Sequence, residues 1–356
     1  MTTLFFELIQ VAIGQRHQLS TTPTAPQWAE LFALSAKHTL IGIAYSGIER
    51  LPKEQRPELD IALQWNNEVR RIEAENRLQV KQCQNLVAHF NRDGFNALVF
   101  KGQANRPFYP ENLRERRTAG DIDVWVWPMG HSRHPHRSVI EYCQRIVPGQ
   151  HLCYIHYDFP VLSNAIVEMH IRPSFLCHPV RNHRLQKWFK QLQAKGIRRS
   201  EEMGDDYGAL LLLHIYKHLF EEGIGLRQLL DYYLFLKHQG KEIGEKSLAN
   251  EIAPKGLGLE SFHTNLLEVL QVVFEGREPL AIKQTSRKLL DEIMRAGNFG
   301  QYDDRIEHTT EPRRHAWEKL KHNFRLIGLY PSEVLWEPAF RWYHWLWRTF
   351  RLWRWE

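Results

Sequence analysis

Several common catalytic and structural signatures are missing from this sequence. It contains no G-x-S-x-G motif, no Walker A loop and no G-x-G-x-x-G motif. These absences remove the α/β-hydrolase, P-loop and dinucleotide-binding classes. Cysteine is also scarce: the four residues, Cys83, Cys143, Cys153 and Cys177, form no C-x-x-C pair. They predict reduced thiols instead of a disulfide framework or a zinc site.

Long hydrophobic runs are missing as well. No segment offers about 20 consecutive uncharged apolar residues, so we expect no membrane-spanning helix. The N-terminal stretch has no basic region, and Glu7 interrupts its apolar residues, which argues against a signal peptide. We therefore expect a cytoplasmic protein.

The composition is that of a globular chain. Hydrophobic residues make up 43% and charged residues 25% of its 356 residues, enough for two or three domains with real cores. The formal net charge of +6 permits a polyanionic partner, such as a nucleotide, a nucleic acid or a membrane surface, without requiring one.

The hydrophobic pattern predicts an α+β fold in three regions. Residues 1–93 form a helical region, with helical spacing at 28–51 and in a long helix at 68–90 that ends before Gly94. Residues 94–200 form a small α/β core, with strands at 96–100, 121–127, 156–162 and 165–173 and a helix at 137–147. Residues 201–356 form a second helical region.

The run TAGDIDVWVW contains two acids where a buried strand is expected. Strand alternation places Asp121 and Asp123 on one face with Trp125 and Trp127, opposite the three aliphatic residues between them. Two carboxylates about 4 Å apart in a partly buried site repel each other by about 4 kcal/mol, so a bound cation is a natural remedy. A solvated outer face is the alternative. For the two tryptophans we favour covering the sheet against a helical region over stacking on a base.

A later strand, AIVEMHIR, repeats this pattern. Its polar face presents Glu168, His170 and Arg172, and its other residues are apolar. If this strand lies beside the first, three carboxylates converge, a donor set that suits Mg²⁺ or Mn²⁺. Relief of the repulsion should then make an Asp123→Asn variant slightly more stable.

Several motifs together resemble a known family. FKG, RRTAGDIDVWV and VEMHIRP, in this order, are similar to the uncharacterised bacterial nucleotidyltransferase family of the polymerase-β-type nucleotidyltransferase superfamily. WAELFALSAKHTL and HIYKHLFEEGIGLRQLLDYYLFL resemble the helices on either side of that family's core. One departure from the wider superfamily is that Gly102 is followed by Gln103 instead of Ser.

The resemblance implies both an activity and its residues. It implies a small mixed sheet flanked by helices, an NTP substrate, and metal-dependent transfer of an NMP group to an acceptor with release of pyrophosphate. The acceptor is unidentified: a sugar, a metabolite, a protein or an RNA. Asp121, Asp123 and Glu168 correspond to ligands of Mg²⁺ or Mn²⁺, and Lys101, Gly102 and Arg117 to contacts of the phosphates. The alternative is a nucleotide-binding or scaffold protein that keeps the fold without turnover.

Other polar residues are candidates for the surroundings of this site. His170 is a metal ligand, a base or a hydrogen-bonding support, and Arg172 follows it on the same face. His214 and His218 share a helix face, but HIYKH lacks the glutamate of a zinc-protease motif. We place them, with Asp231, in packing or on the acceptor side.

The last residues are rich in tryptophan and arginine. Helical spacing over 339–353 puts Arg341, His344, Arg348 and Arg351 in one stripe. We expect the aromatic remainder to pack against the preceding helical region. The alternatives are an interfacial helix on anionic lipid and a wall of the acceptor site.

Overall fold

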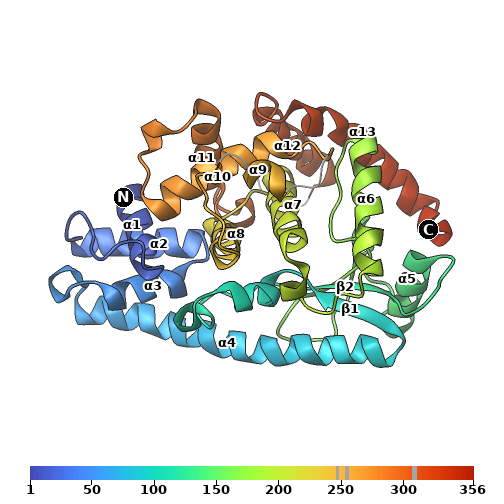
Figure 1. The fold of residues 1–356 in the computed structure, drawn as a ribbon, viewed down its shortest axis with the longest axis horizontal. Coiled ribbons are helices and arrows are strands. Elements are labelled where there is room, and N and C mark those ends of the chain that lie inside the picture. The colour runs from blue at the N-terminus through green and yellow to red at the C-terminus, as the bar shows by residue number, and fades with distance from the viewer. Residues whose placement is uncertain (246–247, 253–255, 307–310) are drawn as a thin grey trace.

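One small β-sheet lies within a chain that is otherwise helical (Figure 1). The computed structural model describes residues 1–245, 248–252, 256–306 and 311–356. Within these residues it has thirteen α-helices and one mixed four-stranded sheet, which confirms the predicted α+β class. In the same residues, no helix combines the length and apolarity needed to cross a membrane.

The sheet has the order β1-β2-β4-β3. Its strands are β1 (Phe95–Val99), β2 (Ile122–Pro128), β3 (His156–Asp158) and β4 (Val167–His170). β1 and β3 are antiparallel to their neighbours, whereas the two central strands, β2 and β4, run parallel. Equivalent residues of β2 and β4 therefore lie side by side at the same end of the sheet.

Alternation along β2 sends its side chains to two hydrophobic clusters. Ile122, Val124 and Val126 are buried with residues of α5 (Pro135–Ile146) and of the long helix α4 (Leu59–Arg92). Trp125 and Trp127 are buried in a larger cluster formed with residues of the flanking helices. The expectation that the tryptophans cover the sheet against helices is confirmed.

The last two strands are shorter than the sequence pattern predicts. β3 ends at Asp158 instead of residue 162, and β4 spans four residues of the predicted 165–173. Pro160 carries no N–H to continue β3. Beyond β4, the N–H groups of Ile171 and Arg172 both donate to the carbonyl oxygen of Ile155, so the ladder with β3 stops. The pattern also missed α6 (Pro179–Ala194), a mainly polar helix that buries only a narrow stripe including Leu185, Phe189 and Leu192.

Four helices precede the sheet: α1 (Thr2–Ala12), α2 (Ala25–Lys37), α3 (Ile41–Arg50) and α4 (Leu59–Arg92). α4 begins nine residues before the predicted start and runs along the lower side of the molecule in Figure 1, beneath both α3 and the sheet. It ends just before Gly94, whose φ of +90° suits glycine and turns the chain into β1.

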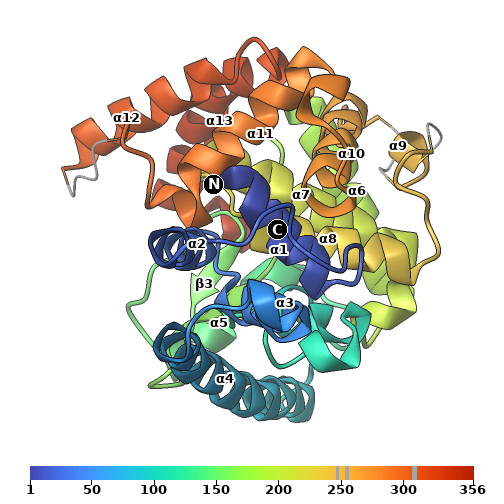
Figure 2. The same cartoon turned by 90° about the vertical axis from the view of Figure 1, so that its left-hand side faces the viewer.

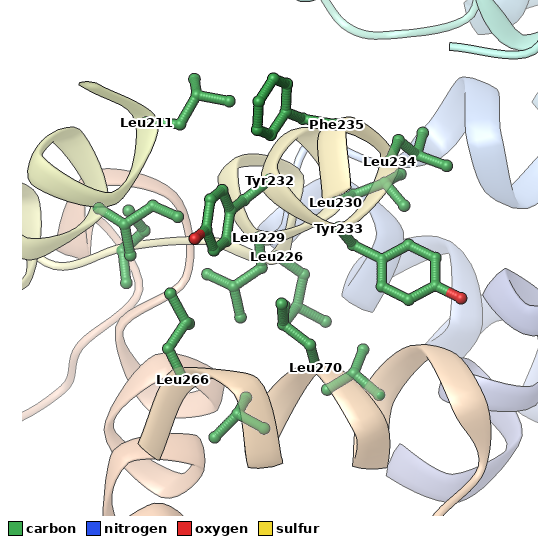
Figure 3. Close-up of a cluster of buried hydrophobic side chains, with 14 of the residues drawn as sticks. Leu211, Leu226, Leu229, Leu230, Tyr232, Tyr233, Leu234, Phe235, Leu266 and Leu270 are labelled. Atoms are coloured by element: carbon green, nitrogen blue, oxygen red, sulfur yellow. The ribbon is translucent and has the colours of Figure 1, made fainter. Parts of the chain in front are cut away.

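After α6, the chain continues with α7 (Asp205–Glu221), α8 (Leu226–His238), α9 (Leu248–Glu251), α10 (Glu260–Glu275) and α11 (Gln284–Ala296). Figure 3 shows leucine and tyrosine side chains of α8 between Leu211 of α7 and Leu266 and Leu270 of α10. Buried residues of α1–α3 belong to the same cluster, and α1 lies close to α10 (Figure 2). The predicted boundaries at residues 93 and 200 stay a prediction.

The chain closes with α12 (Pro312–Arg325), α13 (Pro331–Thr349) and a 3-10 turn at Leu352–Trp355. The expected packing against the preceding helical region is wrong for the two buried tryptophans of residues 339–353. Trp347 and Trp353 are instead buried in the cluster of the sheet, and Phe340 stacks on Phe175 with 4.4 Å between ring centroids. The helix ends at Thr349, and Arg351 has a φ of +52°, so Arg351 does not continue the predicted stripe.

Candidate active site

Three acidic side chains line one cavity at one end of the sheet. Because β2 and β4 are parallel, their register places Asp123 beside Glu168. Asp121 lies two residues before Asp123 and therefore faces the same side. All three carboxylates line one cavity, so the convergence predicted from the two strand patterns is present.

This cavity, of about 450 Å³, lies between the sheet, α7, α8 and the turn after α11. Its volume falls in the range of small-molecule sites. The predicted residues that line it are Lys101, Gly102, Arg117, Asp121, Asp123, Glu168, His214, His218 and Asp231. His170 lies behind the carboxylates, and Arg172 points away, toward Tyr154 and Glu356.

Asp123 is held as an anion by two buried neighbours. Lys101 Nζ lies 2.7 Å from Asp123 Oδ1, and His170 Nε2 lies 2.9 Å from the same oxygen. Burial alone favours the neutral acid, but the Lys101 charge and the His170 contact outweigh it and keep the pKa of Asp123 well below its usual value. The contact with Lys101 predicts the opposite of the stabilisation expected for Asp123→Asn, because this change would leave a buried lysine without its partner.

Glu168 shares the imidazole of His170 with Asp123. Its Oε2 lies 3.1 Å from His170 Nε2 and 3.2 Å from His156 Nδ1. Burial raises the pKa of Glu168, but the contact with His170 helps to outweigh burial, so the pKa lies below its usual value. His170 therefore fixes the positions of two carboxylates, and His156, which the sequence reading missed, lines the cavity beside them.

Asp121 is in a different environment from Asp123. Burial, followed by the charges of Asp123 and Glu168, raises the pKa of Asp121 to about 6. The carboxylate repulsion inferred from the D-x-D motif is therefore seen at Asp121, where it raises the pKa. A divalent cation beside Asp121 would remove it.

The segment after β1 closes one side of the cavity. Lys101 follows the strand, and Gly102 has a φ of +58° at the start of a 3-10 helix, Gly102–Phe108. A Cβ on Gly102 would lie 3.2 Å from the carbonyl oxygen of Asp121. Glycine is needed here because both the backbone angle and the close approach disfavour a side chain.

Two buried arginines face the cavity in different ways. Arg117 forms a bidentate pair with Asp231, with Nε–Oδ1 and Nη2–Oδ2 distances of 2.7 and 2.8 Å. Arg227 donates through Nη1 to the backbone oxygens of Thr118 and Ala119, and its buried Nε has no hydrogen-bond partner in the part of the chain that the structure describes. Burial and the charge of Arg117 lower the pKa of Arg227 to about 10, so it stays cationic at neutral pH.

One face of α7 forms the opposite wall. His214, Lys217, His218 and Glu221 follow helical spacing, and Lys217 pairs with Glu221 at 3.0 Å. Burial keeps the pKa of both histidines far below the usual value, and that of His218 falls to about 3. The sequence reading named only the histidines, although the H-x-x-K-H-x-x-E spacing carries the full signal.

The charges of the cavity indicate whether it suits a metal. Among the described residues, six carboxylates and four lysine or arginine side chains line it, and its three histidines are neutral at pH 7 by their lowered pKa values. The lining therefore has two more negative than positive charges. This oxygen-rich set fits Mg²⁺ or Mn²⁺, and a triphosphate would be repelled without such cations.

Comparison with known proteins identifies the family. A family described as uncharacterised nucleotidyltransferase matches residues 24–274, which include the three acids and most of the cavity. The chain belongs to this family. No curated protein and no solved structure matches the chain. Membership of the uncharacterised nucleotidyltransferase family indicates a transferase that uses an NTP, and it leaves the acceptor open.

Proposed function

We propose that this protein transfers an NMP group from an NTP to an acceptor in a metal-dependent reaction that releases pyrophosphate. The observation that carries the proposal is the meeting of Asp121, Asp123 and Glu168 in one cavity whose charge is negative. A nucleotide phosphate is itself an anion. A cavity of this kind can hold it only together with divalent cations.

The three acids would hold Mg²⁺ or Mn²⁺. When bound, the metal neutralises their charge and polarises the phosphate oxygens of the substrate. His170 keeps Asp123 and Glu168 in place through their shared contact with its Nε2. Glu168 has a second role in this proposal, as the group that receives a proton from an acceptor hydroxyl.

The triphosphate would lie along the side formed by Lys101, Gly102 and Arg227. The open backbone at Gly102 lets N–H groups approach a phosphate oxygen, and Lys101 supplies charge beside it. Arg227 offers donors that no carboxylate occupies among the described residues. Arg117 contributes by holding Asp231, because its Nε and Nη2 donate to that carboxylate and its Nη1 donates to the backbone oxygen of Thr118.

The acceptor would enter on the side of α7. Neutral His214 and His218 can exchange hydrogen bonds with hydroxyl groups, and Lys217 adds a cation. This wall suits an acceptor with hydroxyl or phosphate groups, such as a sugar, a metabolite or an RNA end, and a side chain of a protein is also compatible.

Pyrophosphate release measures this activity directly. The protein is incubated with each NTP, with Mg²⁺ or Mn²⁺, and with acceptors of each class. We expect release that requires the metal and rises with one acceptor class. Glu168→Gln should remove it, and Glu141→Gln, the same change in an exposed pair with Arg137 on α5, should keep it.

The ion pair between Lys101 and Asp123 favours one alternative, a nucleotide-binding protein without turnover. In that protein the ammonium group of Lys101 would permanently replace the metal ion beside Asp123. NTP binding by calorimetry without pyrophosphate release from any acceptor would support it. Absence of both binding and release would contradict both functions.

A further inference from the structure

Exposed aromatic side chains gather on α13 and the turn that follows it. We call four of these side chains, together with the exposed Leu335, the aromatic face. Its members are Leu335, Trp342, Trp345, Phe350 and Trp355, with exposed fractions of 65, 65, 51, 64 and 76% in that order. Leu335, Trp342 and Trp345 share one side of the helix, since seven and ten residues separate them. Exposed apolar groups concentrated in this way mark an interaction site.

The aromatic face is carried by a well-anchored element. Trp347 and Trp353 are buried against the sheet, and Trp347 Nε1 donates to Glu356 Oε2 at 3.1 Å. Glu356 is also paired with Arg172. Figure 1 shows α13 along the outer edge of the molecule, with the C-terminus beside α5. The outward rings are therefore presented on an ordered surface and do not belong to a loose tail.

The charges around the aromatic face are of one sign. Residues 338–355 contain no Asp or Glu. Arg348, Arg351 and Arg354 are exposed, and within the described residues they form no ion pair. The two flanking acids are already engaged, Glu337 by Arg341 and Glu356 by Arg172. An anionic surface would meet cations here without facing an unpaired carboxylate.

An apolar cleft of about 460 Å³ opens between α6 and α13 beside this face. Trp336, Phe340, Trp342 and Tyr343 line it from α13. Trp342 borders both the cleft and the aromatic face, so the two form one continuous apolar region. Such a cleft can accept a hydrocarbon chain next to an interface.

We propose that α13 and its following turn bind the surface of an anionic lipid bilayer. Tryptophan prefers the level of the headgroups, and arginine pairs with lipid phosphate while its stem stays among apolar groups. A single strand of nucleic acid fits less well, because such strands follow basic grooves with interleaved rings, whereas these arginines gather at one end of the helix. The region lies outside residues 24–274, so this inference goes beyond the family's activity.

Vesicle co-sedimentation of the full chain tests the proposal. We expect binding to vesicles containing phosphatidylglycerol, weak binding to pure phosphatidylcholine, and loss of binding at high salt. Arg351→Glu with Arg354→Glu should weaken binding about thirtyfold or more, and Trp342→Ser with Trp345→Ser about tenfold. Trp317→Ser, which changes an exposed tryptophan of α12, is the matched control and should bind as the unchanged protein does.

Thermal melting separates binding from folding, because the altered rings are exposed and each variant should melt as the unchanged protein does. Three results would overturn the proposal. They are no binding to anionic vesicles at low salt, equal binding by the Trp342/Trp345 variant and the control, and tighter binding to single-stranded RNA than to the vesicles. A dimer that the Trp342/Trp345 variant abolishes, without vesicle binding, would assign the face to a second copy of the chain instead.

Discussion

The cavity and the aromatic face differ in which kind of side chain they bury and which kind they expose. In the cavity, charged groups are buried, and pairs such as Arg117–Asp231 and Lys101–Asp123 offset the loss of water. On the aromatic face, large apolar groups are exposed, and the exposed arginines beside them form no ion pair within the described residues. Neither arrangement favours folding, since buried charge costs free energy and exposed rings gain none.

The difference indicates the function of each region. A buried set of acids, with one pKa raised and two lowered, suits chemistry on a charged substrate. A ring-bearing surface suits contact with a partner that supplies apolar area. Substitutions in the cavity should therefore change activity, stability or both, and substitutions on the aromatic face should change neither.

The largest expected effect comes from Glu168→Gln. Loss of one carboxylate from the set should lower pyrophosphate release at least about a thousandfold, equivalent to about 4 kcal/mol of barrier. The thermal unfolding curve should stay cooperative. Release within tenfold of the unchanged protein would show that Glu168 takes no part in the reaction.

The next effect concerns the buried ion pair between Asp231 of α8 and Arg117. Asp231→Asn would leave Arg117 without its carboxylate and close to Arg227, so the free energy of unfolding should fall by about 3–5 kcal/mol. Urea titration measures this. The double variant Arg117→Met/Asp231→Leu should recover part of the loss. A drop below about 1 kcal/mol for Asp231→Asn would mean that the pair is not needed.

Asp121 and Asp123 should respond in opposite directions in metal-free protein. Asp123→Asn leaves Lys101 unpaired and should lower the free energy of unfolding by about 2–3 kcal/mol. Asp121→Asn should raise it by about 1 kcal/mol at pH 7, after discounting for the partial exposure of Asp121.

The pH dependence follows from the raised pKa of Asp121. The stability that its neutral form contributes is present below the unfolded pKa and is lost as pH rises through about 6. The gain from Asp121→Asn should therefore be absent near pH 4 and complete near pH 7. Urea titrations at the two pH values measure it, and a gain of equal size at both would contradict the assigned environment.

The smallest expected effect comes from the aromatic face. Trp342→Ser with Trp345→Ser should change the free energy of unfolding by no more than about 0.5 kcal/mol, because both rings are already exposed. Trp347→Ala, on the buried side of the same helix, should cost about 3–5 kcal/mol. Equal losses in the two variants would remove the distinction between the two sides of α13.

Period-2 alternation predicted which residues of each strand share a face, and it left open whether the two strands are neighbours. Their parallel pairing in the structure places Asp123 beside Glu168. Alternation could not assign partners to the charges. Arg117 precedes the acid motif in sequence, yet its guanidinium is taken by Asp231, more than a hundred residues away. The same limit hid His156 and the wall of α7, whose approach to the sheet depends on the packing of α7 and α8.

The C-terminal helix illustrates a second limit. Helical spacing separated arginines from rings, but it could not tell which rings meet the sheet. Trp347 is buried and Trp345 is exposed, although both are tryptophans two residues apart. The left-handed backbone at Arg351 also ends the stripe that spacing alone extends.

Binding of Mn²⁺ tests the central claim most directly. Calorimetric titration of the unchanged protein, Asp121→Asn, Glu168→Gln and the surface control Glu141→Gln at neutral pH requires no acceptor. We predict that the unchanged protein and the control bind Mn²⁺ alike, and that both cavity variants bind it at least about tenfold more weakly. Equal affinity in all four proteins would contradict the assignment of Asp121, Asp123 and Glu168 as the metal site.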